Sequence, residues 1–240
     1  MIRVAVNGAL GKMGVVTVAA VEAAADMTLV AALDKQDDLA VALKQQQPDV
    51  LIDFTLPECV FANTITAIEV GVRPVIGATG LSLDEIDTLQ QQCAKQSLGG
   101  IVAPNFSISA VLMMQMAQQA ARYLPDVEII EMHHPDKVDA PSGTAKATAE
   151  MIALGREGEG ILGSHPAARC VAGVPIHSLR MPGMFAHQHV IFSGAGERLT
   201  LQQDCTDRRA MMPGVLMAAR YVMESSQLHY GLDKLFVRKS

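Results

Sequence analysis

The first hundred residues alternate between short apolar runs and longer segments in which apolar residues recur with helical spacing. The short runs are rich in β-branched residues, which is typical of buried strands, and cover residues 2–7, 27–33, 50–54, 75–77 and 101–103. The segments between them have the length of crossover helices and cover residues 13–25, 39–47, 58–70 and 83–96. This alternation predicts a parallel sheet built from right-handed strand–helix–strand units.

The pattern changes after about residue 105. A Met-rich helix is predicted for residues 108–123 and a strand for 127–132, followed by a polar loop. Three more strand-like runs, at residues 177–181, 188–193 and 199–205, lie close together in the sequence, which favours a mixed or antiparallel sheet. The last predicted helix, residues 209–224, is expected to return to the first domain. We therefore predict one domain of residues 1–104 with 208–240 and a second of residues 105–207.

Composition excludes several classes of protein. Half of the 240 residues are hydrophobic, and the formal charge of −6 comes with scattered Lys and Arg residues, so no basic patch for nucleic acid is expected. No apolar run reaches the roughly 18 to 20 residues that span a bilayer. The start of the chain lacks the regions of a signal peptide, and the cysteines form no paired spacing. These features predict a cytoplasmic protein with reduced thiols and without a membrane segment.

A glycine-rich loop joins the first predicted strand to the first predicted helix. Its residues are Gly8, Ala9, Leu10, Gly11, Lys12, Met13 and Gly14. In a dinucleotide-binding fold, glycines at this place let the backbone approach the pyrophosphate, and the helix N-terminus offers partial positive charge. The spacing G-x-x-G-x-x-G departs from the usual G-x-G-x-x-G, and such glycines often mark only a tight turn. The favoured fold class is α/β, a Rossmann-like parallel-sheet dinucleotide-binding domain plus a second α+β domain with a mixed sheet.

An acidic residue at the end of the second predicted strand supports this interpretation. Asp34 stands where an acid binds the ribose hydroxyls of a nicotinamide dinucleotide. Lys35 follows it, and a base beside the acid would suit the 2′-phosphate of NADPH. We therefore expect NADH or NADPH as the cofactor. The alternative is that both residues are ordinary solvated charges.

The polar loop that begins near residue 131 carries the strongest candidates for catalysis. His133 is suited to move a proton near neutral pH, and Lys137 supplies positive charge for an anionic substrate. Ser142, Gly143 and Thr144 open a helix and offer hydroxyls and amides to a carboxylate. His134, next to His133, would point to the opposite face of a strand, so one of the two histidines could be structural.

Two other kinds of site fit this loop less well. His133, His134, Asp136 and Asp139 are possible metal ligands, but their spacing is not that of a regular metal site, so no metal is predicted. Ser142 lacks the G-x-S-x-G elbow of a serine hydrolase.

The segment from Glu131 to Ala145 closely resembles the hallmark of the dihydrodipicolinate reductase family. Further similar motifs occur in the family's order at residues 4–14, 52–55, 77–80, 103–107 and 194–199. The resemblance implies further residues on the nicotinamide and ribose side of the cofactor site: Phe54, Thr55, Gly77, Thr79, Ala103, Asn105 and Phe106. Taken alone, Phe54 would be interpreted as a core aromatic residue. Gln188 and Gln203 depart from the pattern, since many relatives have histidines there.

The resemblance also implies a reaction. The family reduces a cyclic imine dicarboxylate on the route to diaminopimelate and lysine, by hydride transfer from the nicotinamide to C4 and protonation of the resulting enamine. It implies that His133 is the proton donor, that Lys137 shares in catalysis, and that the substrate carboxylates are held by His134, Ser142, Gly143 and Thr144. It further implies a homotetramer joined through the sheet of the second domain.

Two other functions share some of these features. Another two-domain nicotinamide oxidoreductase, such as an amino acid or aldehyde dehydrogenase, would have the glycine loop but would not require the His-Lys loop. A redox-sensing regulator that binds NADH without turnover would need a basic DNA-binding segment, which the acidic composition disfavours.

Overall fold

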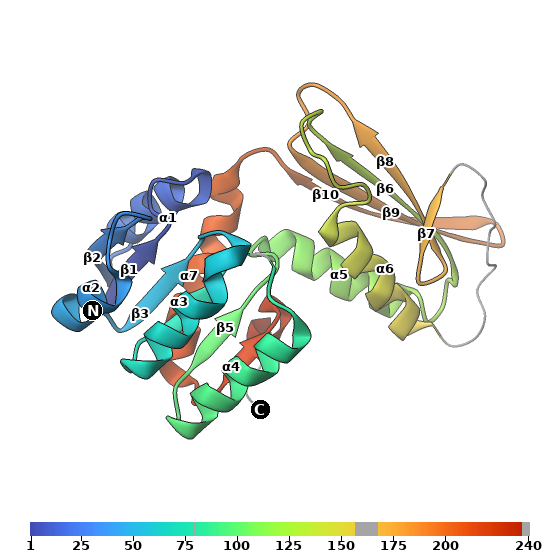
Figure 1. Cartoon of the computed structure of the whole chain (residues 1–240). Helices are drawn as coiled ribbons and strands as arrows, with labels where there is room; N and C mark the ends of the chain where they lie inside the picture. Colours follow the sequence, from blue (N-terminus) through green and yellow to red (C-terminus); the bar gives the residue numbers. More distant parts are fainter. Residues whose placement is uncertain (79, 157–167, 237–240) are drawn as a thin grey trace. The chain divides into compact units, whose positions relative to one another are not determined.

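The computed structural model describes residues 1–78, 80–156 and 168–236 (Figure 1). The chain divides into two compact units. One consists of Met1–Ile108 and Met211–Ser240, and the other of Ser109–Ala210. The sequence pattern predicted a second domain of residues 105–207. The divisions in the structure fall a few residues later in the chain at both ends of this domain.

The first unit contains a six-stranded sheet in which all paired strands are parallel, with the order β11-β5-β4-β3-β1-β2. The strands are β1 (Ile2–Asn7), β2 (Met27–Leu33), β3 (Val50–Asp53), β4 (Arg73–Ile76), β5 (Gly100–Val102) and β11 (Leu228–Tyr230). All residues of the central strand β3 are buried, as expected for a parallel sheet that is covered on both faces. The predicted strands 2–7 and 27–33 are confirmed, whereas β11 was not predicted.

Helices flank this sheet. They are α1 (Lys12–Ala23), α2 (Leu39–Gln46), α3 (Pro57–Glu69), α4 (Leu83–Lys95) and α7 (Met212–Glu224), followed by the short 3-10 helix η2 (Leu232–Phe236). Helix α4 starts with a capping box between Ser82 and Glu85, which satisfies two backbone N–H groups. Helix α7 contacts α1, β3, β4 and β5, and its apolar side buries Val215, Ala218 and Val222. The last predicted helix therefore packs within this unit.

The second unit contains a five-stranded sheet with the order β10-β9-β6-β8-β7. Its strands are β6 (Asp126–His133), β7 (Arg169–Val171), β8 (Val174–Arg180), β9 (Ala186–Gly194) and β10 (Glu197–Cys205). The pair β6–β8 is parallel and the other pairs are antiparallel, so the sheet is mixed. The predicted fold class is confirmed by the parallel first sheet and this mixed second sheet. Strand β7 was not predicted.

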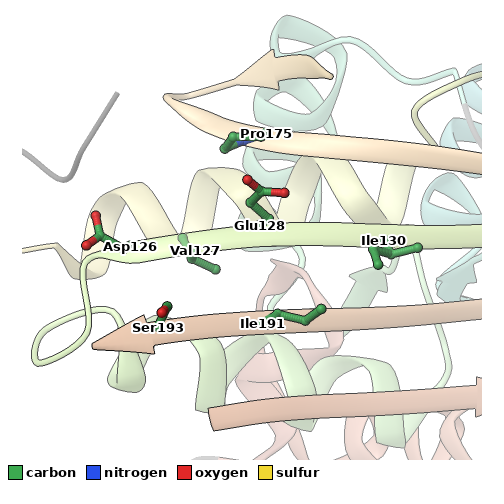
Figure 2. A pocket seen from close by; sticks show the side chains of 7 residues that line it. All are labelled: Asp126, Val127, Glu128, Ile130, Pro175, Ile191 and Ser193. Atoms are coloured by element: carbon green, nitrogen blue, oxygen red, sulfur yellow. The ribbon is translucent and has the colours of Figure 1, made fainter. Parts of the chain in front are cut away.

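One face of this second sheet is turned away from the unit's core. Side chains alternate between the two faces of a strand, so the even-numbered residues of β6 share this face. Figure 2 shows a pocket on these strands, lined among others by Glu128, Ile130, Pro175 and Ile191. We call the surface formed by Glu128, Ile130, Pro175, Ile191 and Ser193 the open sheet face.

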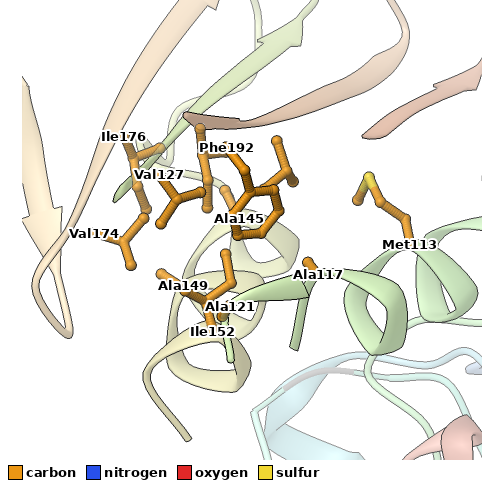
Figure 3. Packing of buried hydrophobic residues seen from close by; sticks show 12 residues of the cluster. Met113, Ala117, Ala121, Val127, Ala145, Ala149, Ile152, Val174, Ile176 and Phe192 are labelled. Atoms are coloured by element: carbon orange, nitrogen blue, oxygen red, sulfur yellow. The ribbon is translucent and has the colours of Figure 1, made fainter. Parts of the chain in front are cut away.

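The opposite face of the same sheet carries the core of the unit. Helices α5 (Ile108–Ala120) and α6 (Gly143–Gly155) supply small residues such as Ala117 and Ala149, which pack against Val127, Ile176 and Phe192 of the sheet (Figure 3). Small helical residues let the helices lie close to the large side chains of the strands.

Among the described residues, no helix is long and apolar enough to cross a membrane.

Candidate active site

The glycine loop between β1 and α1 is held in a tight turn. Gly8 has φ of +76°, a conformation that favours glycine, and its carbonyl oxygen accepts a 3.0 Å hydrogen bond from the Gly11 amide. Helix α1 begins at Lys12 with Gly11 as N-cap, so no side chain caps its first turn, and that turn holds no acidic residue. The amides of this turn and Lys12 can therefore face an anion.

Two of the loop's glycines are required by close approaches. A Cβ atom on Gly14 would lie 2.0 Å from the carbonyl oxygen of Gly8 and 2.6 Å from the Cα of Ala9. A Cβ atom on Gly8 would lie 2.9 Å from the carbonyl oxygen of Phe54. Glycine at these two positions therefore allows the turn, the start of α1 and the residues after β3 to pack closely, as the glycines of a dinucleotide-binding loop do.

Asp34 links the end of β2 to this loop. Its carboxylate accepts hydrogen bonds from the amides of Lys35 at 2.9 Å and Leu10 at 3.0 Å. These two bonds, that of Lys35 first, hold the pKa of Asp34 below its usual value, so the acid is ionised at neutral pH. The side chain of Lys35 is exposed. The structure thus joins Asp34 to Leu10 of the glycine loop.

A buried carboxylate that the sequence did not single out lies at the end of β3. Asp53 is 0% exposed. It accepts hydrogen bonds from Asn7 at 2.9 Å, from Asn63 at 3.1 Å, and from the amide and hydroxyl of Thr55 at 2.8 and 2.5 Å. Asp53 therefore fixes the turn that contains Phe54 and Thr55 against the end of β1.

Aromatic side chains meet at the carboxyl ends of the neighbouring strands. The rings of Phe54 and Phe106 form an edge contact with centroids 5.9 Å apart. A Cβ atom on Gly77 would lie 2.1 Å from Cε1 of Phe54, so a side chain at this position would displace the ring. Ala103 is buried, and the side chain of Asn105 accepts a hydrogen bond from the Ser107 amide. Thr79 lies outside the described residues. The described residues predicted for the nicotinamide side thus all lie in the first unit, at or just after the carboxyl ends of its strands.

The predicted proton donor sits in the second unit, at the end of β6. Glu131 and His133 are two residues apart on this strand and share one face. The Nδ1 atom of His133 lies 2.5 Å from Oε2 of Glu131, which is 1% exposed. Arg180 of β8 donates to both carboxylate oxygens of Glu131, at 2.9 and 3.0 Å. Burial alone would raise the pKa of Glu131, but hydrogen bonds from His133 and Arg180 outweigh it and lower the pKa to about 2.

Lys137 lies in the loop that follows His133. Its Nζ atom donates to Asp139 at 2.7 Å, and its backbone amide donates to the carbonyl oxygen of His134 at 3.2 Å. Hydrogen bonding to Lys137 is the main reason that the pKa of Asp139 is lowered. The side chain of His134 is half-buried. The loop thus gathers Lys137, His134 and Asp139 close to the strand that carries His133.

The Ser-Gly-Thr segment forms the start of α6. Ser142 is the N-cap, is 2% exposed, and accepts a hydrogen bond from the Ala145 amide through its hydroxyl oxygen. Its own amide donates to Glu131 at 3.3 Å. Gly143 is exposed, and a Cβ atom there would meet nothing within 4 Å. The Ser142 hydroxyl oxygen is therefore engaged in capping the helix, and Gly143 leaves open space at the helix start.

Gln188 and Gln203 are buried on the core face of the second sheet. Gln188 pairs with Gln203 on one side and Glu131 on the other in the strand register. Gln188 donates to Thr148 of α6, and Gln203 donates to Ser109 of α5. In the described part of the chain, no group of three or more metal-ligating side chains is found.

Glu131, Arg180 and Asp53 are thus among the residues that contact the predicted site and that the sequence did not assign. Glu131 and His133 are two residues apart at the end of the predicted strand 127–132, and this spacing was a usable signal. Arg180 gave none, because its contact with Glu131 depends on the pairing of β6 with β8.

Comparisons with known proteins agree along nearly the whole chain. The family model for dihydrodipicolinate reductase, N-terminus, matches residues 2–106, and that for dihydrodipicolinate reductase, C-terminus, matches residues 109–236. The 4-hydroxy-tetrahydrodipicolinate reductase of Coxiella burnetii (strain Dugway 5J108-111) is 51% identical over 236 residues, which cover 98% of this chain and 99% of that protein. That of Enterococcus faecalis (strain ATCC 700802 / V583) is 44% identical over 260 residues, with 98% and 100% covered.

Solved structures agree with this relationship. The dipicolinate-bound dihydrodipicolinate reductase from Paenisporosarcina sp. TG-14 is 40% identical, with a TM-score of 0.87 over 98% of this chain and 99% of that one. An amine dehydrogenase from Mycobacterium smegmatis has a TM-score of 0.64 at 12% identity, over 99% of this chain and 97% of its own, and shares the fold alone. This chain belongs to the dihydrodipicolinate reductase family and is an oxidoreductase whose cofactor is NADH or NADPH.

Proposed function

We propose that this oxidoreductase reduces 4-hydroxy-tetrahydrodipicolinate (dihydrodipicolinate) to tetrahydrodipicolinate in the biosynthesis of diaminopimelate and lysine. The observation that carries the proposal is the second unit's loop, which gathers an acid, His133, and a cation, Lys137, near the start of α6. The structure of the Paenisporosarcina relative is described as dipicolinate-bound, and dipicolinate is a six-membered ring with two carboxylates. A cyclic dicarboxylate is the kind of ligand that such a loop can bind.

We assign the dinucleotide to the domain of residues 1–104 with 208–240. When bound, its nicotinamide supplies a hydride to C4 of the unsaturated cyclic imine that forms from the substrate by loss of water. The chain binds and orients the dinucleotide. The glycine loop binds the pyrophosphate, Asp34 binds the ribose hydroxyls, and Lys35 binds the 2′-phosphate when NADPH is used. The nicotinamide and its ribose are lined by Phe54, Thr55, Gly77, Thr79, Ala103, Asn105 and Phe106.

We assign the substrate to the domain of residues 105–207. His133 donates the proton that the enamine takes up after hydride transfer, and Lys137 stabilises the negative charge that builds on the ring. The two carboxylates are held by His134, Ser142, Gly143 and Thr144, the last three through the N-terminal turn of α6. Because the Ser142 hydroxyl oxygen caps this helix, its hydroxyl hydrogen and the neighbouring amides are what the segment offers a carboxylate.

The same domain is assigned the oligomer contact. The open sheet face exposes half-buried apolar side chains such as Ile130 and Ile191 beside polar ones, a composition that suits a subunit interface. We propose that this face joins a homotetramer, and that the enzyme works in the cytoplasm as a biosynthetic protein with four free thiols.

The activity is tested by oxidation of NADH and of NADPH, followed by absorbance. Dihydrodipicolinate synthase, pyruvate and aspartate semialdehyde generate the substrate in place, and omission of the synthase gives the control. Oxidation that depends on the synthase supports the proposal. Comparable kcat/KM for the two cofactors would support the assignments of Asp34 and Lys35, and a preference above about a hundredfold, about 2.7 kcal/mol, would contradict dual use.

Two substitutions test the residue roles. His133→Gln should lower kcat by about 10² to 10⁴-fold, the usual contribution of a general acid, and leave NADH binding intact. Lys137→Ala should raise the substrate KM and lower kcat, because it removes charge that acts on substrate and ring. Unchanged kcat in the first variant, or an effect on cofactor affinity alone in the second, would contradict the assignments.

A further inference from the structure

We propose that Glu131 and Arg180 are positioning residues for this reaction. Glu131 fixes which nitrogen of His133 carries the hydrogen, and Arg180 couples Glu131 to the loop that carries Lys137. The inference rests on the proposed function, since it takes His133 as the proton donor and Lys137 as the cation that faces the substrate.

The first step concerns the tautomer of His133. Glu131 is ionised over the working pH range, and an ionised carboxylate can only accept hydrogen bonds. The hydrogen in the 2.5 Å contact therefore belongs to Nδ1 of His133. This leaves Nε2, on the other side of the ring, as the atom that gives its proton to the substrate and is left unprotonated afterwards. Because Nδ1 keeps its hydrogen throughout, no rearrangement is needed when the proton is transferred.

The second step concerns Arg180, whose five N–H donors are all engaged. Two go to Glu131, at 2.9 and 3.0 Å, and one to the carbonyl oxygen of Leu179 in its own strand, at 2.8 Å. The last two reach the loop, at the carbonyl oxygens of Lys137 (3.2 Å) and Asp139 (2.7 Å). Arg180 therefore binds the backbone on both sides of residue 138, and the neighbouring carboxylate of Asp139 holds the Lys137 ammonium at 2.7 Å.

These contacts predict different effects for the two residues. A glutamine at position 131 keeps one side-chain oxygen for the Ser142 amide and the Arg180 guanidinium, but it loses the charge that faces Nδ1 of His133. Glu131→Gln should therefore lower kcat by about 10²-fold or more and change the substrate KM by less than about threefold. A lysine has three donors on one atom and cannot span the carboxylate and both loop carbonyls. Arg180→Lys should therefore lower kcat and also raise the substrate KM about tenfold, because the loop with Lys137 is released.

A double-mutant cycle separates positioning from a general loss of structure. If Glu131 acts through His133, Glu131→Gln should cost little further kcat when added to His133→Gln, whereas independent effects would multiply. Glu150→Gln, the same substitution at an exposed position of α6, is the control and should leave kcat and KM unchanged. NADH binding and thermal unfolding show whether each variant is folded.

A spectroscopic readout keeps the test independent of activity. Ring-nitrogen NMR of the ¹⁵N-histidine-labelled enzyme, with His133 assigned from the His133→Gln spectrum, should show Nδ1 as the protonated nitrogen in the neutral ring, and Glu131→Gln should shift hydrogen to Nε2. The inference would be overturned if His133 had the same tautomer in wild type and in Glu131→Gln. It would also be overturned if the effects of Glu131→Gln and His133→Gln on kcat multiplied in the double variant. Loss of synthase-dependent oxidation in the wild type, with the tautomer as expected, would instead refute the proposed function.

Discussion

The sharpest structural prediction concerns Gly14 in the turn between β1 and α1. Replacement by alanine would place a Cβ atom 2.0 Å from the carbonyl oxygen of Gly8 and 2.6 Å from the Cα of Ala9, and both contacts are with backbone. Ordinary contact begins near 3.4 Å, so the loop or the helix must move by about 1.4 Å. Helix propensity alone would favour alanine by about 1 kcal/mol, but such overpacking costs about 1–3 kcal/mol.

The net of these two effects is a free energy of unfolding that Gly14→Ala lowers by up to about 2 kcal/mol, measured by urea titration. A loop displaced by more than 1 Å should also raise the Kd for NADH about 100-fold, or about 2.7 kcal/mol, measured by fluorescence titration. Gly11→Ala is the matched control for stability, because its Cβ atom would lie 3.2 Å from the same Gly8 oxygen and its φ of −72° suits alanine. A Gly14→Ala protein as stable as wild type, with unchanged NADH affinity, would refute the reasoning.

Three further predictions follow from buried groups. Asp53→Asn should lower the free energy of unfolding by about 2–3 kcal/mol, because an amide nitrogen cannot accept the hydrogen bonds that the buried carboxylate receives. A variant that is as stable as wild type in urea titration would contradict this prediction. The pKa of Glu131 is lowered to about 2, so its stabilisation is complete above its ordinary pKa of 4.5 and is lost as the pH falls towards 2. Between pH 6 and pH 3, wild type should therefore lose about 2 kcal/mol more unfolding free energy than Glu131→Gln, and parallel losses in urea titrations would speak against it. Burial raises the pKa of the Cys93 thiol to about 12, so iodoacetamide should modify Cys93 only after unfolding. The exposed Cys170 should react in the native protein. Detection by mass spectrometry of a Cys93 adduct formed in the native protein would contradict this prediction.

The sequence pattern was sufficient for the strands that are long or fully buried. β1 and β2 end at the predicted residues, because continuous apolar runs between turn residues mark them clearly. β11 carries a weaker signal: only Leu228 of its three residues is buried, and its place in the sheet comes from pairing with β5, far away in the sequence. β7 is equally short and forms a hairpin with β8 whose turn includes Gly173.

The candidate site was predictable where its residues follow one another in the chain. The glycine loop and the segment from residue 133 to 144 carry their chemistry in local order, so motif and spacing were sufficient to select them. The contact between Arg180 and Glu131 joins residues 49 positions apart and depends on the register of β6 with β8, which composition and periodicity do not specify. The role of Asp53 could not be predicted for a related reason. It depends on hydrogen bonds with Asn7 and Asn63, and these contacts also depend on the fold.

The most direct test of the proposed reaction follows the hydride itself. NADH carrying deuterium in place of both hydrogens at C4 of the nicotinamide is supplied together with dihydrodipicolinate synthase, pyruvate and aspartate semialdehyde, and the product is analysed by NMR. We expect deuterium at C4 of tetrahydrodipicolinate, only when the synthase is present. Deuterium at another carbon, or no synthase-dependent oxidation of NADH or NADPH by the folded protein, would contradict the proposed function.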